Sequence, residues 1–209
     1  MLNMFKLCKI GFIKHFLLVI GGDCMTKKKN ELWEWTKALL IAVALAAVIR
    51  YFLFAPIVVD GLSMMPTLKD QDRMIVNKFS YEIGEPKRFD IIVFHAPEKK
   101  DYIKRVIGLP GDTIEYKDDT LYVNGKAYKE PYLDKYKKEA EGPLTYSFKL
   151  EETAVGRKTV PKGELFVMGD NRRFSKDSRH IGTIPMSKVI GKTNMVYWPI
   201  KDAHIVKVK

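Results

Sequence analysis

Twelve consecutive residues near the start of the chain, Ala38–Ile49, all have apolar side chains. After one arginine the apolar character resumes, and the 17 residues Ala38–Phe54 would measure about 26 Å as a helix, at the low end for crossing a bilayer core. A helix buried in a protein core rarely lacks polar residues around its whole circumference for three turns. The run therefore predicts one transmembrane helix at residues 38–56, ended by Pro56, which cannot donate the next helical hydrogen bond.

The flanks of the apolar run indicate its orientation. Trp33 and Trp35 stand before it, where interfacial aromatic residues belong. Basic residues crowd the same side: Lys27, Lys28, Lys29 and Lys37. By the positive-inside rule, residues 25–37 form a cytoplasmic basic segment and residues 57–209 form an extracytoplasmic domain.

Residues 1–24 contain no apolar stretch long enough to span a bilayer. Met25 is followed by Thr-Lys-Lys-Lys and looks like a second start of translation, so we expect 1–24 to be a poorly ordered or dispensable extension. Both cysteines of the chain, Cys8 and Cys24, lie in this extension. The domain after Asp60 can therefore have neither a disulfide nor a thiolate metal site.

The composition of the chain is that of a folded protein, with 46% hydrophobic and 29% charged residues. The net charge is +11, but from position 60 onward the 28 basic residues are interspersed with 22 acidic ones. A dedicated nucleic-acid surface would concentrate its basic residues, so we expect no nucleic-acid partner.

After Asp60 the hydrophobic pattern changes to short runs with a period near two, rich in β-branched and aromatic residues and bounded by Gly and Pro. Asn124-Gly125 is a strong signal for a hairpin whose two central residues both take positive φ. Residues 134–143, rich in Lys and Glu, favour a solvated loop. We expect a mainly β domain with strands at 73–79, 89–94, 102–107, 113–116, 121–123, 126–128, 146–150, 165–168 and 190–198.

Ser63 lies between a glycine and a proline just after the apolar run, in the segment Asp60–Thr67. A serine hydroxyl needs a base to become a good nucleophile. The segment lacks the second glycine of the G-x-S-x-G motif and has no lysine three residues after the serine. Three histidines of the outer domain are possible triad bases, but none lies in a distinctive context, and the default for each is an ordinary polar or surface residue: His95, His180 and His204.

Two further segments are distinctive. In Tyr102–Asp112, strand alternation puts Lys104 and Arg105 on opposite faces, so one of the two charges must approach an apolar face. Taken alone, this lysine could simply protect a sheet edge from aggregation. The segment Gly169–Arg179 is dense in small polar and charged residues after an apolar run, and alone it would be a solvated turn.

Together, the three segments resemble the motifs of type I signal peptidases, membrane-bound Ser/Lys proteases that remove leader peptides from exported proteins. The matching segments are G-x-S-M-x-P-T at Gly61–Thr67, K-R-V-I-G-L-P-G-D at Lys104–Asp112 and G-D-N-R-R-x-S-x-D-S-R at Gly169–Arg179. Three long motifs in the right order after a membrane span are hard to explain by chance. The resemblance covers roughly Trp33 to Pro199 and is closest to the Gram-positive form of the family.

The resemblance implies a fold of two antiparallel sheets around a shallow groove and cleavage after small residues in A-x-A-like sites. It implies Ser63 as nucleophile, Lys104 as general base and Ser175 as the residue that orients the Lys104 amine. The oxyanion would be bound mainly by the Ser63 backbone N–H. Gram-negative members have a serine where this chain has Gly61, so a second oxyanion donor is unassigned.

The resemblance also implies a structural charge network that holds the third segment against the lysine strand. It pairs Asp170 with Arg105 and Asp177 with Arg179. Many members of the family have Arg-Gly-Asp where this chain has Arg-Phe-Asp, with Phe89 in the middle. We expect this difference to affect the local turn and not the chemistry.

The proposed base makes a physical demand. With an ordinary pKa of about 10.4, Lys104 would be neutral in about one molecule in 2,500 at pH 7, a cost of about 4.6 kcal/mol before any chemistry. Desolvation can lower a lysine pKa by about 3–5 units, which is the size required. We therefore expect Lys104 to be buried, to have no carboxylate partner and to lie within hydrogen-bonding reach of Ser63.

These inferences predict a cell-membrane serine endopeptidase with a cytoplasmic N-terminus, acting on exported preproteins, without metal or organic cofactor. Its other expected partners are membrane lipid and the translocation machinery. Two alternatives are left open: a self-cleaving Ser/Lys protease of the repressor-processing type and a non-catalytic membrane-anchored β module. The membrane span and the absence of a DNA-binding helical domain argue against the first.

Overall fold

A computed structural model describes residues 31–52, 54–78, 81, 84–98 and 100–206. The expectations for residues 1–24 and for the start of the basic segment lie outside these residues. The chain divides into two compact units, Met1–Leu45 and Ala46–Lys209.

Helix α2 (Glu31–Phe52) contains the apolar run and begins with acidic residues in its first turn, where they complement the helix dipole. Leu39, Leu40 and Val43 on this helix are more than half exposed. Within the described residues, no helix combines the length and the apolar content required to cross a membrane.

The expected end of the helix at Pro56 is wrong. Helix α2 ends at Phe52, and Pro56 lies inside strand β1 (Phe54–Val58), opposite Ile75 of β2 (Arg73–Asn77). A proline is tolerated here because β1 is the edge strand of its sheet, where one side of the backbone needs no ladder partner.

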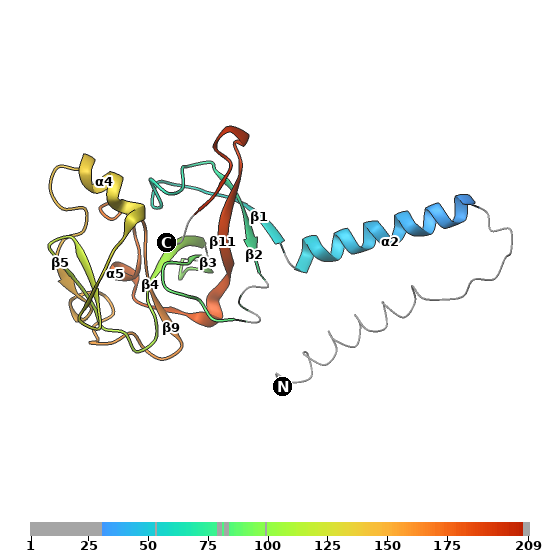
Figure 1. The fold of residues 1–209 in the computed structure, drawn as a ribbon. Helices are drawn as coiled ribbons and strands as arrows, with labels where there is room; N and C mark the ends of the chain where they lie inside the picture. The colour runs from blue at the N-terminus through green and yellow to red at the C-terminus, as the bar shows by residue number, and fades with distance from the viewer. Residues whose placement is uncertain (1–30, 53, 79–80, 82–83, 99, 207–209) are drawn as a thin grey trace. The chain divides into compact units, whose positions relative to one another are not determined.

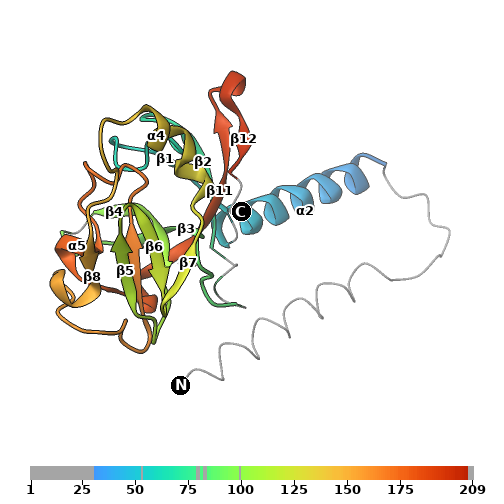
Figure 2. The ribbon, with the colours of Figure 1, turned by 60° about the vertical axis from the view of Figure 1, so that its left-hand side comes forward.

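The second unit is mainly β, as the sequence predicts, and is built from two antiparallel sheets (Figures 1 and 2). The larger sheet has the order β1-β2-β11-β3-β4-β9-β10, with β12 paired to β11, and the smaller has the order β7-β6-β5-β8. The remaining strands of the larger sheet are β3 (Ile91–His95), β4 (Asp101–Gly108), β9 (Glu164–Met168), β10 (Ile184–Pro185), β11 (Val189–Trp198) and β12 (His204–Ile205). Those of the smaller sheet are β5 (Ile114–Lys117), β6 (Thr120–Val123), β7 (Lys126–Tyr128) and β8 (Phe148–Lys149).

Sequence patterns located most of these strands to within a few residues. The hairpin between β6 and β7 is confirmed, since Asn124 and Gly125 have φ of 53° and 76°. The expected strand at 146–150 is shorter, because Leu150 already begins a 3₁₀ turn.

The expected loop at 134–143 is wrong in its first half, which forms helix α4 (Asp134–Glu139). This helix buries none of its residues, so no apolar periodicity marked it in the sequence. The other short helical elements are α5 (Ser178–Ile181), η1 (Pro131–Leu133), η2 (Leu150–Glu152), η3 (Met186–Lys188) and η4 (Ile200–Asp202).

Strand β4 is central to the larger sheet, where it pairs with β3 on one side and β9 on the other. Residues of β4 and β9 also join a core cluster with the smaller sheet, which includes Ile107, Phe166 and Tyr116, all at most 1% exposed. A second cluster, to which the Ser63 segment contributes Met64, also contains Leu68, Met74, Ile91 and Val196. The strand that carries Lys104 is therefore held rigidly by its two neighbours.

Candidate active site

The turn that carries Ser63 is anchored at both of its ends. The Val59 N–H donates to the Asp72 carbonyl at 2.8 Å, and the Gln71 N–H donates to the Val59 carbonyl at 2.9 Å. Met64 and Leu68 point into the core and are 1% and 0% exposed. Met64 is thus a core residue, and its burial beside Ser63 fixes the position of the serine backbone.

Gly61 takes φ of +97°, a conformation that favours glycine. Its N–H donates to Asp70 Oδ1 at 2.8 Å, so this amide already has a partner. A second oxyanion donor is therefore not supplied by the Gly61 backbone in this conformation. The Ser63 N–H, by contrast, donates to no other group among the described residues.

Lys104 lies opposite Ile92 in the β3–β4 ladder and is 4% exposed. Its Nζ donates to Ser63 Oγ at 2.8 Å and to the Ile103 carbonyl at 3.1 Å. The amine also lies 5.0 Å from the centre of the Tyr102 ring. The structure thus brings together the serine and the lysine, which are 41 positions apart in the sequence.

Burial lowers the pKa of Lys104 to about 8, against the opposing influence of the Asp177 and Asp170 charges, which raise it. Within the described residues Lys104 forms no ion pair, because each of these aspartates is paired with an arginine. A lysine with this pKa has a substantial neutral fraction near neutral pH, as a general base requires.

Ser175 is 6% exposed, but its Oγ makes no hydrogen bond within the described residues. The expected hydrogen bond between Ser175 and the Lys104 amine is therefore not formed in this structure. Ser175 does lie against the Ser63 segment. A Cβ placed on Gly169 would fall 2.2 Å from Ser175 Oγ and 2.4 Å from the Ser63 carbonyl oxygen, so only glycine fits between them.

Asp170 and Arg105 form a fully buried bidentate pair. Arg105 Nε donates to Asp170 Oδ1 at 2.8 Å, and Nη2 donates to Oδ2 at 2.6 Å. The Thr67 hydroxyl also donates to Asp170 Oδ2. The turn after Ser63 is thereby tied to the strand that carries Lys104.

Asp177 and Arg179 form the second pair, with Arg179 Nε and Nη2 each 2.8 Å from a carboxylate oxygen of Asp177. Asp177 also caps helix α5 and accepts the Gly169 N–H at 3.0 Å. Both pairs have the partners that the resemblance implies, and each one orders the segment on which Ser175 lies.

Sequence reasoning missed a third buried pair, between Arg172 and Glu130. The arginine also donates to the hydroxyls of Tyr116 at 2.6 Å, Tyr132 at 3.3 Å and Thr145 at 3.3 Å. This cluster links the third motif segment to the smaller sheet. Its only sequence signal was the doubled arginine after Asn171, since Glu130 stands in no recognisable pattern.

Phe89 takes φ of +69°, the left-handed conformation in which glycine is favoured. Its carbonyl accepts Arg105 Nη1 at 3.0 Å, and its ring centre lies 5.8 Å from that of Tyr132 and 6.2 Å from that of Tyr128. The turn thus has the geometry that a glycine would adopt, with the strain offset by aromatic packing.

Ser63 and Lys104 open into a cavity of about 240 Å³. Its other lining residues come from the end of β1, the Ser63 turn, the start of β4 and the third motif segment: Val58, Val59, Asp60, Met64, Asp101, Tyr102, Ile103 and Lys176.

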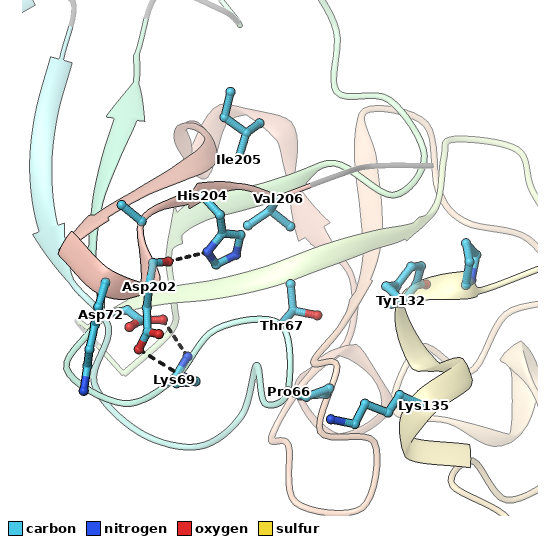
Figure 3. Close-up of a pocket in the computed structure, with 13 residues that line it drawn as sticks. Pro66, Thr67, Lys69, Asp72, Tyr132, Lys135, Asp202, His204, Ile205 and Val206 are labelled. Carbon is cyan, nitrogen blue, oxygen red and sulfur yellow. Dashed lines mark hydrogen bonds and ion pairs between the residues drawn. The ribbon is translucent and has the colours of Figure 1, made fainter. Parts of the chain in front are cut away.

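A larger cavity of about 750 Å³ contains neither Ser63 nor Lys104 in its lining (Figure 3). In Figure 3 the Lys69 amine lies beside the Asp202 carboxylate, and His204 Nδ1 lies 2.6 Å from the Asp202 carbonyl oxygen. This cavity has no activated nucleophile and is not the catalytic site.

None of the three candidate histidines hydrogen-bonds Ser63 in the part of the chain that the structure describes. His95 lies 2.7 Å from Asp101 and His180 lies 4.0 Å from Asp177, and both are more than half exposed. Within that part there is also no cluster of three or more His, Cys, Asp or Glu residues able to hold a metal ion.

Comparison with known proteins gives a consistent result. The family model described as signal peptidase, peptidase S26, matches residues 32–198. This chain belongs to the peptidase S26 family. Its S26 relatives include signal peptidase I of Bacillus caldolyticus, 52% identical over 182 residues that cover 85% of this chain and 97% of the relative. Signal peptidase IB of Staphylococcus aureus is 41% identical over 178 residues, covering 83% and 93%.

The S26 fold is also found among solved structures. A crystal structure of a signal peptidase I from Enterococcus faecalis matches with a TM-score of 0.51 and 44% identity, covering 52% of this chain and 97% of that one. Family membership makes this chain a serine peptidase, and the matches favour neither the repressor-processing nor the non-catalytic alternative.

Proposed function

We propose that this chain is a membrane-anchored endopeptidase that removes signal peptides from exported preproteins after small residues, using a Ser63–Lys104 dyad. The observation that carries the proposal is the buried Lys104 amine 2.8 Å from Ser63 Oγ, with a pKa lowered to about 8. The names of the relatives, signal peptidase I over more than four fifths of the chain, support the choice of substrate.

In the acylation step, Ser63 Oγ attacks the carbonyl carbon of the scissile bond while the neutral Lys104 amine takes the hydroxyl proton. The oxyanion that develops is bound by the Ser63 N–H, which has no competing acceptor in the described residues. The resulting ammonium then gives its proton to the leaving amine of the mature protein, and the C–N bond breaks.

In the deacylation step, the same amine takes a proton from water as the water oxygen attacks the acyl-enzyme ester. Collapse of the second tetrahedral intermediate returns the proton to Ser63 Oγ and releases the signal peptide. Because the Ile103 carbonyl holds the amine at 3.1 Å, Lys104 stays aimed at the reacting atoms in both steps.

Ser175 is proposed to orient the Lys104 amine by a hydrogen bond formed in the catalytic cycle. The support for this role is its unpaired Oγ at a 6% exposed position, since buried hydroxyls rarely stay without a partner. The charge pairs of Asp170 with Arg105 and Asp177 with Arg179 would keep its segment in place.

The apolar part of helix α2, residues 38–52, is proposed as a membrane anchor, with 25–37 in the cytoplasm and the chain from Phe54 onward outside the cell membrane. The supporting features are the uninterrupted apolar sequence, the lysines before it and the exposure of Leu39, Leu40 and Val43 on α2. Carbonate extraction of membranes should leave the full chain in the pellet, and external protease should digest 54–209 in intact spheroplasts. Release of the chain by carbonate would refute the anchor.

The proposed activity is tested with a detergent-solubilised full chain and a preprotein that has an A-x-A site. The parent should cleave it after the second alanine, and Ser63→Ala and Lys104→Ala should each lower the rate by at least about 10³-fold. Full activity of Lys104→Ala with loss in His95→Ala would replace the dyad by a histidine triad. Cleavage of its own chain alone would favour the self-processing alternative.

A further inference from the structure

Lys176 lines the same cavity as Ser63 and Lys104. Its ammonium is paired with the carboxylate of Glu98, which lies between β3 and β4. The Tyr102 hydroxyl donates to the other oxygen of Glu98 at 2.8 Å, and Tyr102 also lines the cavity. The lysine of this ion pair thus lines the catalytic cavity without taking part in the proposed reaction steps.

This ion pair is exchangeable. The side chains of Lys176 and Glu98 are 57% and 46% exposed, and pairs of this kind contribute little to stability. If a competing carboxylate takes the ammonium, Glu98 still accepts the Tyr102 hydroxyl and remains in contact with water. No buried charge is left unpaired by the exchange.

The charges around the cavity make the Lys176 ammonium the place where a substrate carboxylate would bind. Lys104 must be neutral to act as a base, so Lys176 is the remaining cation among the described lining residues. The acidic lining residues are Asp60 and Asp101, and Asp101 is paired with His95 at 2.7 Å. A carboxylate would therefore be attracted at one place on the cavity wall, whereas elsewhere it would meet like charge.

We propose that Lys176 is a specificity-determining residue whose ammonium binds an acidic side chain of the substrate next to the cleaved bond, in exchange for Glu98. This inference rests on the proposed peptidase function and adds a substrate preference to it. A direct contact with the ammonium should favour an acidic side chain at one substrate position only. A general electrostatic attraction would instead favour acidic residues at all positions alike.

The competing explanation is that the Lys176–Glu98 ion pair has only a structural role, which is to connect the segment between β3 and β4 to the third motif segment. The two explanations predict different effects of Lys176→Gln and Glu98→Gln on the preference for an acidic substrate residue. If the pair has only a structural role, Lys176→Gln and Glu98→Gln break the same contact and have the same effect on every substrate. If Lys176 binds substrate, Lys176→Gln weakens the preference for an acidic residue, whereas Glu98→Gln removes a competitor and strengthens it.

The experiment uses the full chain in detergent and peptides that differ only in Glu or Gln at one position on either side of the cleaved bond. At one position, the Glu/Gln ratio of kcat/KM should fall about two- to fivefold in Lys176→Gln and rise in Glu98→Gln. Lys126→Gln, on exposed β7, is the matched control and should leave the ratio unchanged. Unchanged ratios at every position in Lys176→Gln, or changes of equal sign in both variants, would overturn the inference.

A binding measurement separates this inference from the peptidase function. Ser63→Ala cannot acylate, so the anisotropy of the same peptides gives their Kd in this background without turnover. Failure of the parent to cleave any peptide would reject the peptidase function. The Glu/Gln ratio of Kd, with and without Lys176→Gln, would still decide whether the ammonium selects an acidic side chain.

Discussion

Lys104→Met should stabilise the folded chain at neutral pH while abolishing cleavage. Methionine has a similar length but no charge to desolvate. Lys104 is 4% exposed and burial lowers its pKa to about 8, whereas in the unfolded chain a lysine titrates at about 10.4. Because the folded state binds the proton less tightly, keeping this lysine costs about 3 kcal/mol of stability at pH 7.

The sign and the pH window follow from proton linkage. Between about pH 8 and about pH 10.4 the unfolded chain binds more protons at this position than the folded chain, so the stability of the parent rises with pH relative to the variant. At about pH 10 the remaining cost is below about 1 kcal/mol. Loss of the hydrogen bonds to Ser63 and Ile103 subtracts about 1 kcal/mol each, at every pH.

The assay is urea unfolding of the detergent-solubilised full chain from about pH 7 to about pH 10. The difference in unfolding free energy between Lys104→Met and the parent should shift by about 2–3 kcal/mol across this range, in favour of the parent as pH rises. All other titrating groups cancel in the difference, and Lys126→Met on exposed β7 controls for the new methionine. A difference that does not change with pH would refute the account of Lys104 as a desolvated amine.

Three further predictions follow from the site and its supports. The kcat/KM for a peptide substrate should rise about tenfold per pH unit below about pH 8 and level off above it, because Lys104 must be neutral to act as a base. A pH profile that instead rises around pH 6 would indicate a histidine base. Arg172→Met should lower the unfolding free energy by about 3–5 kcal/mol by leaving Glu130 buried and unpaired, and adding Glu130→Gln should recover part of this loss in urea unfolding. Phe89→Gly should be more stable than Phe89→Ala by about 1 kcal/mol, because both variants lose the ring but only glycine adopts the positive φ without strain. The opposite order of stability in thermal unfolding would contradict backbone strain at this position.

Local patterns were sufficient where the structure depends on nearby residues. The Asn124-Gly125 hairpin follows from the φ preferences of two residues, and β4 follows from a run rich in β-branched and aromatic residues that ends at Gly and Pro. The pairing of Arg105 with Asp170 was inferred from family resemblance, since 65 positions separate the two residues and nothing local connects them.

Local patterns failed where the cause lies in the folded chain or where the element has no apolar periodicity. Pro56 ends a helix by local rules, yet its position on a free sheet edge makes it acceptable in β1. Glu130 stands in an ordinary polar stretch, and only the folded chain brings it against Arg172. The exposure of α4 removed the apolar periodicity that would have revealed it.

Adjacent basic residues on β4 make the proposed activity depend on correct strand pairing. Lys104 faces Ser63 and Arg105 faces Asp170 because neighbouring residues of a strand point to opposite sides. A slip of one residue against β3 would direct the guanidinium, which cannot give up its proton, toward the nucleophile. With the proposed dyad, a copy with this slipped register would have no base beside Ser63, so we expect it to be unable to cleave peptides.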